Sequence, residues 1–434
     1  MDPSTLGALI LLIATVVLLV IGTPIAIAVG GATALAMLAI FTPEQVALTT
    51  SQRMFTGINS FPLLAIPFFV LAGVIMNNGG IATRLIDAAR VLVGRMPGSL
   101  AQANVAANAM FGAVSGSAVA AAAAVGSTMA PQQKREGYDP RFAAAVNIAS
   151  APAGMLIPPS NVLIVYSLVS STSVAALFVG GYLPGMLWAL ACMVVVHLYA
   201  RKRPELKVTE KVSFGVAVMT LLKAIPALLM IVIVIGGILA GIFTPTEAAV
   251  IAVLYSLALA FVYRSVTLKQ LPAIFLEATR TTSIVVFLIG VSTAMAWMMS
   301  FARVPVIISD LILGVSENQI VVLFLIAIAL LIIGTFMDAT PAILIFTPIF
   351  LPIAIEMGMH PIHFGLFMTF AVCVGVITPP VGTVLFVGAR IGKVSMESVL
   401  RPLIPFFIAL ALLLLLVLYV PALSTWLPSL LGLM

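Results

Sequence analysis

A single acidic residue, Asp338, lies deep inside a long apolar run of this sequence. Ile332-Ile333-Gly334 precede it and Ile343 to Phe346 follow it. An ionised carboxylate at membrane depth costs about 2.5–3.5 kcal/mol on insertion scales, so such a group needs a partner. No Lys or Arg is close to it in sequence, and a bound cation is the simplest partner. The alternatives are a protonated Asp338 or a distant ion pair with Arg390 or Lys393.

Neutral oxygen atoms near this carboxylate can complete a cation site. Hydroxyl groups come from Thr335 and Thr340, and the segment Thr378-Pro379-Pro380 follows one span later. Two consecutive prolines lack backbone N–H donors, so carbonyl groups of the preceding turn lose their helical partners. Carbonyl groups at the ends of half-helices are ligands that suit Na⁺ in secondary transporters. These residues therefore predict a sodium site around Asp338.

A second set of polar residues, earlier in the chain, offers oxygen atoms without a formal charge. Its members lie at or near breaks in apolar runs: Ser115, Ser117, Asn147, Pro158, Ser160 and Asn161. We expect a second, weaker Na⁺ site here; the alternative is interhelical hydrogen bonding worth about 0.6 kcal/mol per pair. An anionic substrate is expected in the same neighbourhood, at the hydroxyls of Ser115, Ser160 and Ser171 and at half-helix N-termini near 117 and 160.

The composition places these residues in a polytopic membrane protein. Of the 434 residues, 62% are hydrophobic and 8% are charged, whereas a soluble domain carries about 25% charged residues. The net charge of +6 comes from Lys and Arg in loops, which indicates topology and contact with anionic lipid rather than nucleic acid. Cys192 and Cys373 each lie alone in apolar runs, and His360 and His363 flank Pro361 in an expected solvated turn, so no metal centre is predicted.

Two kinds of interrupted segment must position the polar residues. The apolar runs on either side of Ser115-Gly116-Ser117 are each too short to cross a bilayer, so residues 98–130 predict a re-entrant hairpin. The span 142–169 is interrupted at Ile157-Pro158-Pro159-Ser160-Asn161 and predicts a discontinuous helix. Residues 81–95 have the periodicity of an interfacial amphipathic helix.

The same pattern returns 221 residues later. This shift superimposes six prolines without a gap and places Ser117 on Asp338, which indicates a duplication. The expected division is an N-terminal transmembrane helix (1–23), a first repeat (24–211), a linking transmembrane helix (212–243) and a second repeat (244–434). The second repeat is expected to contain an amphipathic helix at 302–317, a hairpin at 318–352 and a broken helix at 363–389.

Basic residues predict that the two repeats have opposite orientations. Six Lys or Arg lie in the amphipathic helix 81–95 and in the loop after the first hairpin, whereas only Arg303 lies in the matching segments 302–317 and 353–362. Positive charge favours the cytoplasmic side. The first hairpin should therefore open to the cytoplasm and the second to the opposite side, with ten spans and both termini periplasmic. Ligand and ion sites of such inverted repeats collect at the repeat interface near the midplane.

The wording of four motifs resembles one family along essentially the whole chain. The first hairpin with Ser115 to Ala118, the IPPSN break at 157–161, the hairpin GTFMDATPAILIFTPIFLP and the ITPPVGTVLF break at 377–386 look like the large, DctM-type membrane subunit of TRAP transporters. The resemblance implies an elevator-type, Na⁺-driven symporter of the bacterial inner membrane. It also implies partners: a small four-helix membrane subunit (DctQ-type) and a periplasmic binding protein (DctP-type) that delivers an organic acid, a carboxylate.

The same resemblance implies where the sodium ions bind and which helices connect the moving parts. The sodium sites map onto Ser115 and Ser117 with Pro158 to Asn161, and onto Asp338 and Thr340 with Thr378, Pro379 and Gly382. Helices 81–95 and 302–317 would link a scaffold to a moving domain. The small subunit is not recognisable within this sequence, so a separate partner is expected.

Other functions remain open alternatives. A stand-alone Na⁺/dicarboxylate symporter of the same superfamily would share these hairpins and breaks. An intramembrane hydrolase would need a second buried carboxylate or a Ser-His pair at depth, and neither is in the sequence, so we expect a protein that is not an enzyme. A channel or purely structural chain would show no saturable, gradient-coupled flux.

Overall fold

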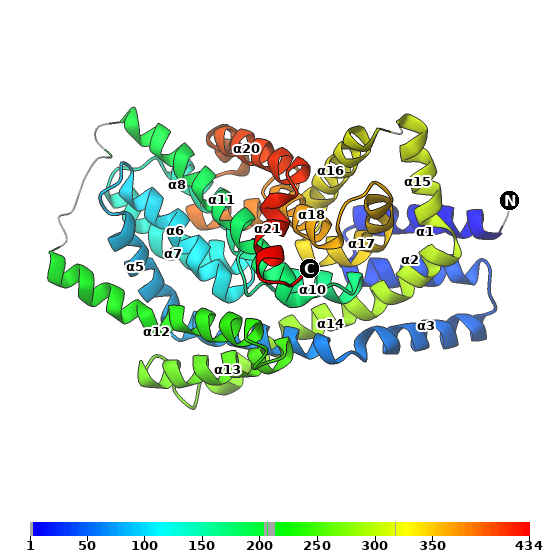
Figure 1. Cartoon of the computed structure of the whole chain (residues 1–434), viewed down its shortest axis with the longest axis horizontal. Coiled ribbons are helices and arrows are strands. Elements are labelled where there is room, and N and C mark those ends of the chain that lie inside the picture. The colour runs from blue at the N-terminus through cyan, green and yellow to red at the C-terminus, as the bar shows by residue number, and fades with distance from the viewer. Residues whose placement is uncertain (1–2, 204–205, 207–212, 317) are drawn as a thin grey trace.

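The computed structural model describes residues 3–203, 206, 213–316 and 318–434, and almost all of these lie in helices (Figure 1). The N-terminal half contains α1 (Pro3–Val20), α2 (Ile25–Leu38), α3 (Pro43–Ile58), η1 (Phe61–Leu64), α4 (Ala65–Asn78), α5 (Ile81–Val93), α6 (Ser99–Ser115), α7 (Ala118–Arg135), α8 (Pro140–Ser150), α9 (Ala153–Leu156), α10 (Asn161–Ser170) and α11 (Val174–Arg201).

The C-terminal half follows the same plan. It contains α12 (Phe214–Leu239), α13 (Pro245–Val262), α14 (Leu271–Phe301), α15 (Val304–Val315), α16 (Gln319–Phe336), α17 (Ala339–Glu356), α18 (Pro361–Gly375), α19 (Thr383–Gly392), α20 (Met396–Tyr419) and α21 (Ala422–Leu430). No β-strand is present in the part of the chain that the structure describes. The prediction of an all-α protein is confirmed.

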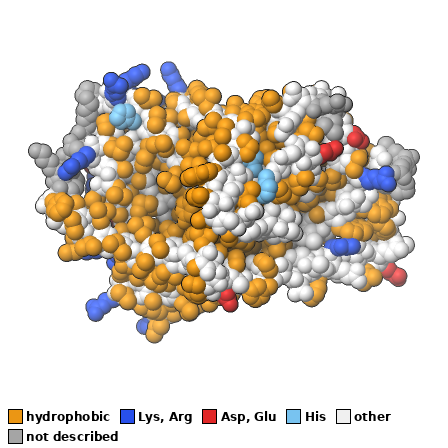
Figure 2. Space-filling view, viewed as in Figure 1, with side chains coloured by type: hydrophobic (Ala, Val, Ile, Leu, Met, Phe, Trp, Pro, Cys, Tyr) orange, Lys and Arg blue, Asp and Glu red, His pale blue; other side chains and the backbone are white. Residues whose placement is uncertain are grey.

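The surface is suited to lipid. Among the described residues, eight helices are long and apolar enough to cross a membrane, or nine when α8, α9 and α10 are taken as one span bent by 46°. Figure 2 shows apolar side chains over most of the visible face, with charged groups mainly near its margins. Phe214 is 83% exposed and Val262 is 74% exposed, which water would not tolerate over so large an area. The predicted polytopic membrane protein is confirmed.

The long helices α3, α12, α13 and α14 form one side of the molecule, at the bottom of the view in Figure 1. There α14 packs against α2, α3 and α4, and α13 packs against α4 and α12. Arg53 lies over the ring of Trp297 at 5.4 Å, and Arg84 of α5 lies over Tyr263 at 3.6 Å. Such cation–π contacts hold α3 against α14 and the start of α5 against the end of α13.

Each element of the first repeat has a counterpart 221 residues later in the second. The hairpin α6–α7 corresponds to α16–α17, the broken span α8–α9–α10 to α18–α19, and α11 to α20. One difference has a local cause. Pro62 interrupts the first copy between α3 and α4, because its ring cannot continue a preceding helix, whereas the second copy has Ser283 there and runs on as the single 31-residue helix α14.

The two repeats exchange helices at their interface. The second arm of the first hairpin, α7, packs along α19 of the second repeat, and the second arm of the other hairpin, α17, packs along α10 of the first repeat. These two contacts are equivalent under the 221-residue shift. The exchange encloses both hairpin tips within protein, where irregular backbone at membrane depth is tolerated.

The hairpins open at opposite ends of the broken span α8–α10. The open end of the first hairpin lies beside the start of α8, where Lys134 and Pro140 line one pocket. The open end of the second hairpin leads to Pro361, whose carbonyl accepts a hydrogen bond of 2.7 Å from Tyr166 near the far end of α10. The inverted repeat with two re-entrant hairpins and two discontinuous helices is therefore the architecture of this chain.

Candidate functional site

The tip of the first hairpin is a tight turn made by Gly116 and Ser117. Gly116 follows α6 with a φ of +63°, a left-handed conformation that glycine adopts without steric cost. The Ser117 hydroxyl then caps α7 by accepting a hydrogen bond from the Ala120 N–H at 3.3 Å. The Ser115 hydroxyl lies beside it and donates to the Ser117 carbonyl at 3.4 Å. Two hydroxyl oxygens thus meet at the N-terminus of α7.

This tip lies directly against the break in the first discontinuous helix. A Cβ atom added to Gly116 would lie 3.0 Å from the Asn161 side-chain nitrogen, and one added to Gly154 would lie 2.1 Å from the Gly112 Cα atom. The backbones of α6 and α9 are therefore in contact, which only glycine allows. The sequence prediction that brings Ser115 and Ser117 near Asn161 agrees with this geometry.

The first break runs from Ile157 to Ser160 and contains a cis bond between Pro158 and Pro159. The Ser160 hydroxyl accepts from the Leu163 N–H at 3.4 Å and donates to the Met155 carbonyl at 2.5 Å. Ser160 is fully buried. Its hydroxyl holds the break together from inside, whereas the half-buried Asn161 at the first turn of α10 faces the hairpin tip.

The tip of the second hairpin carries Asp338. This residue precedes α17 in an extended conformation, yet its side chain makes no capping hydrogen bond. Among the described residues no Lys or Arg forms an ion pair with its carboxylate, since the only polar group near it is the backbone N–H of Ala339. Neither Arg390 nor Lys393 is such a partner, because both line a pocket with Lys134 and Pro140 at the open end of the other hairpin.

The second break lies against the second tip in the same way as the first. A Cβ atom on Gly375 would lie 2.5 Å from the Gly334 Cα atom, so α16 and α18 touch through their backbones. The Gly382 N–H donates to the Thr335 carbonyl at 2.9 Å, which joins the break directly to the hairpin. The bond between Pro379 and Pro380 is cis, as in the first copy.

Threonine hydroxyls surround this second junction. Thr378 donates to the Val374 carbonyl at 2.7 Å and Thr335 to the Ile332 carbonyl at 2.7 Å. Each hydroxyl oxygen keeps lone pairs after donating. Thr340 lies half-buried in the first turn of α17, two residues after Asp338. The Thr335 and Gly382 contact brings the Asp338 hairpin and the Thr378 break together, as the sequence analysis expected.

The two junctions lie on neighbouring elements. Cys373 of α18 approaches the Pro152 carbonyl at 4.0 Å, and α18 also packs against α9 and α10. The two broken spans are thus in contact at their centres, with one hairpin tip on each. This arrangement provides oxygen atoms, two helix N-termini and one carboxylate around a common interior.

One predicted substrate residue does not join them. Ser171 ends α10 with a φ of +55° and is exposed. It follows Ser160 by a full helix, about 15 Å along the axis at 1.5 Å per residue. The prediction placed it by residue type alone, and the direction of α10 carries it away from the break. Ser171 is therefore removed from the candidate site.

A network of buried amides in the first hairpin was not predicted. Asn108 of α6 donates to Ser150 Oγ at 2.8 Å and to Asn147 Oδ1 at 3.1 Å, and Asn147 donates to the Ala122 carbonyl at 2.9 Å. Asn147 thus holds α6, α7 and α8 together below the tip. The polar positions in the small-residue arm 99–108 were the available signal.

Two further residues differ from expectation or add to it. His363 is 1% exposed, and its Nε2–H donates to the Leu418 carbonyl at 3.1 Å, so the predicted solvated turn is wrong for this residue. His360 does lie at the surface and caps α18. Thr383, directly after the second break, has a buried hydroxyl without a hydrogen-bond partner among the described residues. It is an additional oxygen beside the Asp338 junction.

Comparison with known proteins places this geometry in a family. Residues 12–423 match the family model described as "Tripartite ATP-independent periplasmic transporter, DctM component". The chain is 54% identical over 402 residues to an uncharacterised protein, YgiK, of Salmonella typhimurium, and the match covers 92% of each chain. It is 39% identical to the C4-dicarboxylate TRAP transporter large permease protein DctM of Pseudomonas aeruginosa, covering 93% of this chain and 94% of that one.

Two more comparisons extend this picture. The sialic acid TRAP transporter large permease protein SiaM of Vibrio cholerae is 37% identical, with 88% of this chain and 89% of that protein covered. The crystal structure of the Alcanivorax borkumensis YdaH transporter resembles this fold with a TM-score of 0.56 at 16% identity, over 86% of this chain and 87% of that one. The chain therefore belongs to the DctM family, the large permease subunits of TRAP secondary transporters.

Proposed function

We propose that this chain carries an organic acid across the bacterial inner membrane together with Na⁺. A periplasmic binding protein would deliver the acid, and a small four-helix membrane subunit would complete the complex. The support is the family, the two hairpin–break junctions and the names of relatives, which are transporters of C4-dicarboxylate, sialic acid and 2,3-diketo-L-gulonate. These relatives share acidic cargo, so the class proposed here is a carboxylate.

The observation that carries the proposal is the carboxylate of Asp338 at a hairpin tip. It lies within protein at the N-terminus of α17 and has no cation partner among the described residues. A buried carboxylate without a cation is strongly disfavoured in its ionised form. A Na⁺ ion held by Asp338 and Thr340, with oxygens of Thr378, Pro379 and Gly382 across the junction, would neutralise it.

The first junction is proposed as a second Na⁺ site of lower affinity. Its oxygens belong to Ser115, Ser117, Pro158, Ser160 and Asn161, and none has a formal charge. The Ser160 hydroxyl is already used twice, so Ser117 and Asn161 are the main side-chain candidates. The carboxylate cargo would lie near Ser115 and Ser160, against the positive N-terminal ends of α7 and α10.

Transport would move the hairpins and broken spans as one body. Within the described chain these helices pack on one another through the glycine contacts and the helix exchange, while α3, α12, α13 and α14 form the other side of the molecule. The amphipathic helices α5 and α15 connect the two parts in sequence. An elevator movement of the hairpin-containing body, with α5 and α15 as arms, is therefore the motion we propose.

The test is Asp338→Asn in proteoliposomes that contain the small subunit, with the binding protein added outside. Because the amide cannot balance a cation's charge, Na⁺-driven uptake should fall at least about 100-fold, the effect of losing roughly 2.7 kcal/mol of ion binding. Asp310→Asn is the matched control, since Asp310 is an exposed residue of the arm helix α15. It should retain uptake.

Three outcomes would argue against the proposal. Undiminished Na⁺-driven uptake by Asp338→Asn would remove Asp338 from the ion site. Equal loss in Asp310→Asn would point to a general charge effect. Saturable uptake without the binding protein and the small subunit would instead identify a stand-alone Na⁺/dicarboxylate symporter.

A further inference from the structure

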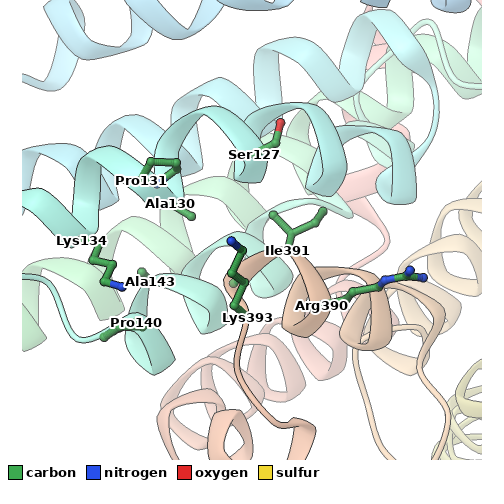
Figure 3. A pocket seen from close by; sticks show the side chains of 10 residues that line it. Ser127, Ala130, Pro131, Lys134, Pro140, Ala143, Arg390, Ile391 and Lys393 are labelled. Carbon is green, nitrogen blue, oxygen red and sulfur yellow. The ribbon is translucent and has the colours of Figure 1, made fainter.

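A basic pocket lies away from both hairpin tips, where the two repeats meet at one face of the protein. It has a volume of about 630 Å³ and lies between the end of α7, the start of α8 and the end of α19. Figure 3 shows the side chains of Lys134 and Lys393 directed into this space from opposite walls, with Arg390 extending along its far side. Three cations from segments more than 250 residues apart in sequence thus share one cavity.

No acidic residue lines the pocket to balance these charges. The nearest acid in sequence to Pro140 is Asp139, whose carboxylate caps α8 by accepting from the Arg141 N–H at 2.9 Å. Lys134 and Arg390 each lie in the last turn of a helix, where a cation is favoured by the helix dipole. That preference explains each residue singly, but it does not explain why three of them face a common space.

The rest of the pocket wall is apolar. Ala130 and Pro131 come from α7, Ala143 from α8 and Ile391 from α19. A small, fully hydrated carboxylate would gain little from such a wall, whereas an amphipathic anion would use the cations and the apolar surface together. The pocket also lies at helix ends, the depth at which lipid headgroups contact a membrane protein.

We propose that this pocket binds the headgroup phosphate of an anionic phospholipid. Lys134 and Lys393 hold the phosphate oxygens, Arg390 contributes at the rim, and the first carbons of the acyl chains lie on Ala130, Pro131 and Ile391. The lipid bridges the first hairpin, through α7, and the second broken span, through α19. It thereby relieves the repulsion among the three cations and ties the two repeats together at this face.

The experiment measures lipid binding to the purified full-length protein by native mass spectrometry. Phosphatidylglycerol is titrated into wild type, Lys134→Ala/Lys393→Ala and Arg135→Ala, with phosphatidylcholine as the zwitterionic comparison. Arg135 is the matched control, because it shares the last turn of α7 but does not line the pocket. One cation near a membrane surface changes affinity about fivefold, so the double variant should bind the tightest phosphatidylglycerol about 30-fold more weakly. Arg135→Ala should change this binding less than the double variant does.

Other outcomes would overturn the proposal. Equal phosphatidylglycerol binding by wild type and the double variant would show that the pocket is not the lipid site. Equal weakening in Arg135→Ala would reduce the effect to net charge. Protection of wild type against heat by inorganic phosphate or succinate, without protection by phosphatidylglycerol, would identify a site for free small anions. Lys134→Gln/Lys393→Gln, which keeps side-chain length, repeats the measurement if the alanine variant is not monodisperse.

Discussion

The two hairpins have the same shape and different chemistry. In both, a glycine of the first arm touches a glycine of the broken span, Gly112 with Gly154 and Gly334 with Gly375. In both, the second arm packs on the broken span of the other repeat. These contacts depend on small residues and backbone, and both copies retain them.

What differs is where each copy places its polar groups. The first hairpin is joined to α8 by Asn108, Asn147 and Ser150 below an uncharged tip. A shift of 221 residues replaces these three with Ala329, Met368 and Ala371, while the tip residue Ser117 becomes Asp338. The duplication therefore preserved the geometry of the junction, and the charge available for a cation is concentrated in one copy.

The largest expected effect comes from breaking the shared geometry. Gly154→Ala and Gly375→Ala each place a Cβ atom 2.1 Å and 2.5 Å, respectively, from a glycine Cα atom of the facing hairpin. Backbone must shift to relieve such contacts, so each should destabilise the fold by about 3 kcal/mol or more. Thermal unfolding in detergent measures this. Gly236→Ala is the control, because nothing lies within 4 Å of its Cβ position.

The result also tests whether the copies are equivalent. Similar losses in Gly154→Ala and Gly375→Ala would support two junctions of one design. A wild-type melting curve for either variant would show that its hairpin is not held by the glycine contact.

An exchange of tip residues sharpens the chemical difference. Asp338→Ser keeps a residue type that caps helices well but removes the charge, so the Na⁺ concentration for half-maximal uptake should rise at least about tenfold, or 1.4 kcal/mol. Ser117→Asp adds a carboxylate at the N-terminus of α7 and should lower that concentration severalfold. Uptake is measured against Na⁺ in proteoliposomes. An unchanged Na⁺ dependence in Ser117→Asp would argue against an ion at the first tip.

The smallest expected effect concerns the amide network. Asn108→Leu removes the donor to Ser150 and Asn147 and should destabilise the protein by about 1–3 kcal/mol. Asn78→Leu is the control, since Asn78 is exposed and bonds only to the Val74 carbonyl of its own helix. Melting midpoints compare the two. A larger loss in Asn78→Leu than in Asn108→Leu would mean that the network adds no stability.

Local signals made much of this architecture predictable. Pro158-Pro159 and Pro379-Pro380 end helices wherever they occur, and Ser115-Gly116-Ser117 between short apolar runs implies a turn within the membrane. The repeat itself was visible because prolines resist substitution by other backbone formers. Asp338 was identified because a carboxylate in an apolar run is rare.

Tertiary pairing was beyond the reach of such signals. Nothing in the sequence of α7 indicates that it packs on α19, and the amides of α6 resemble an ordinary polar stripe until α8 lies against them. His363 was assigned to a solvated turn from its neighbour Pro361, but that proline starts α18 and directs His363 into the interior. Ser171 was misplaced because residue type does not reveal how far α10 continues.

The exchange of helices between repeats has a consequence for biosynthesis. The roughly 250 residues between α7 and α19 take about 12–50 s to translate at 5–20 residues per second. During that interval the first hairpin has been made and its cross-repeat partner has not. Newly inserted chains must therefore shelter an incomplete hairpin, and truncation before α19 should expose it to the quality-control proteases of the membrane.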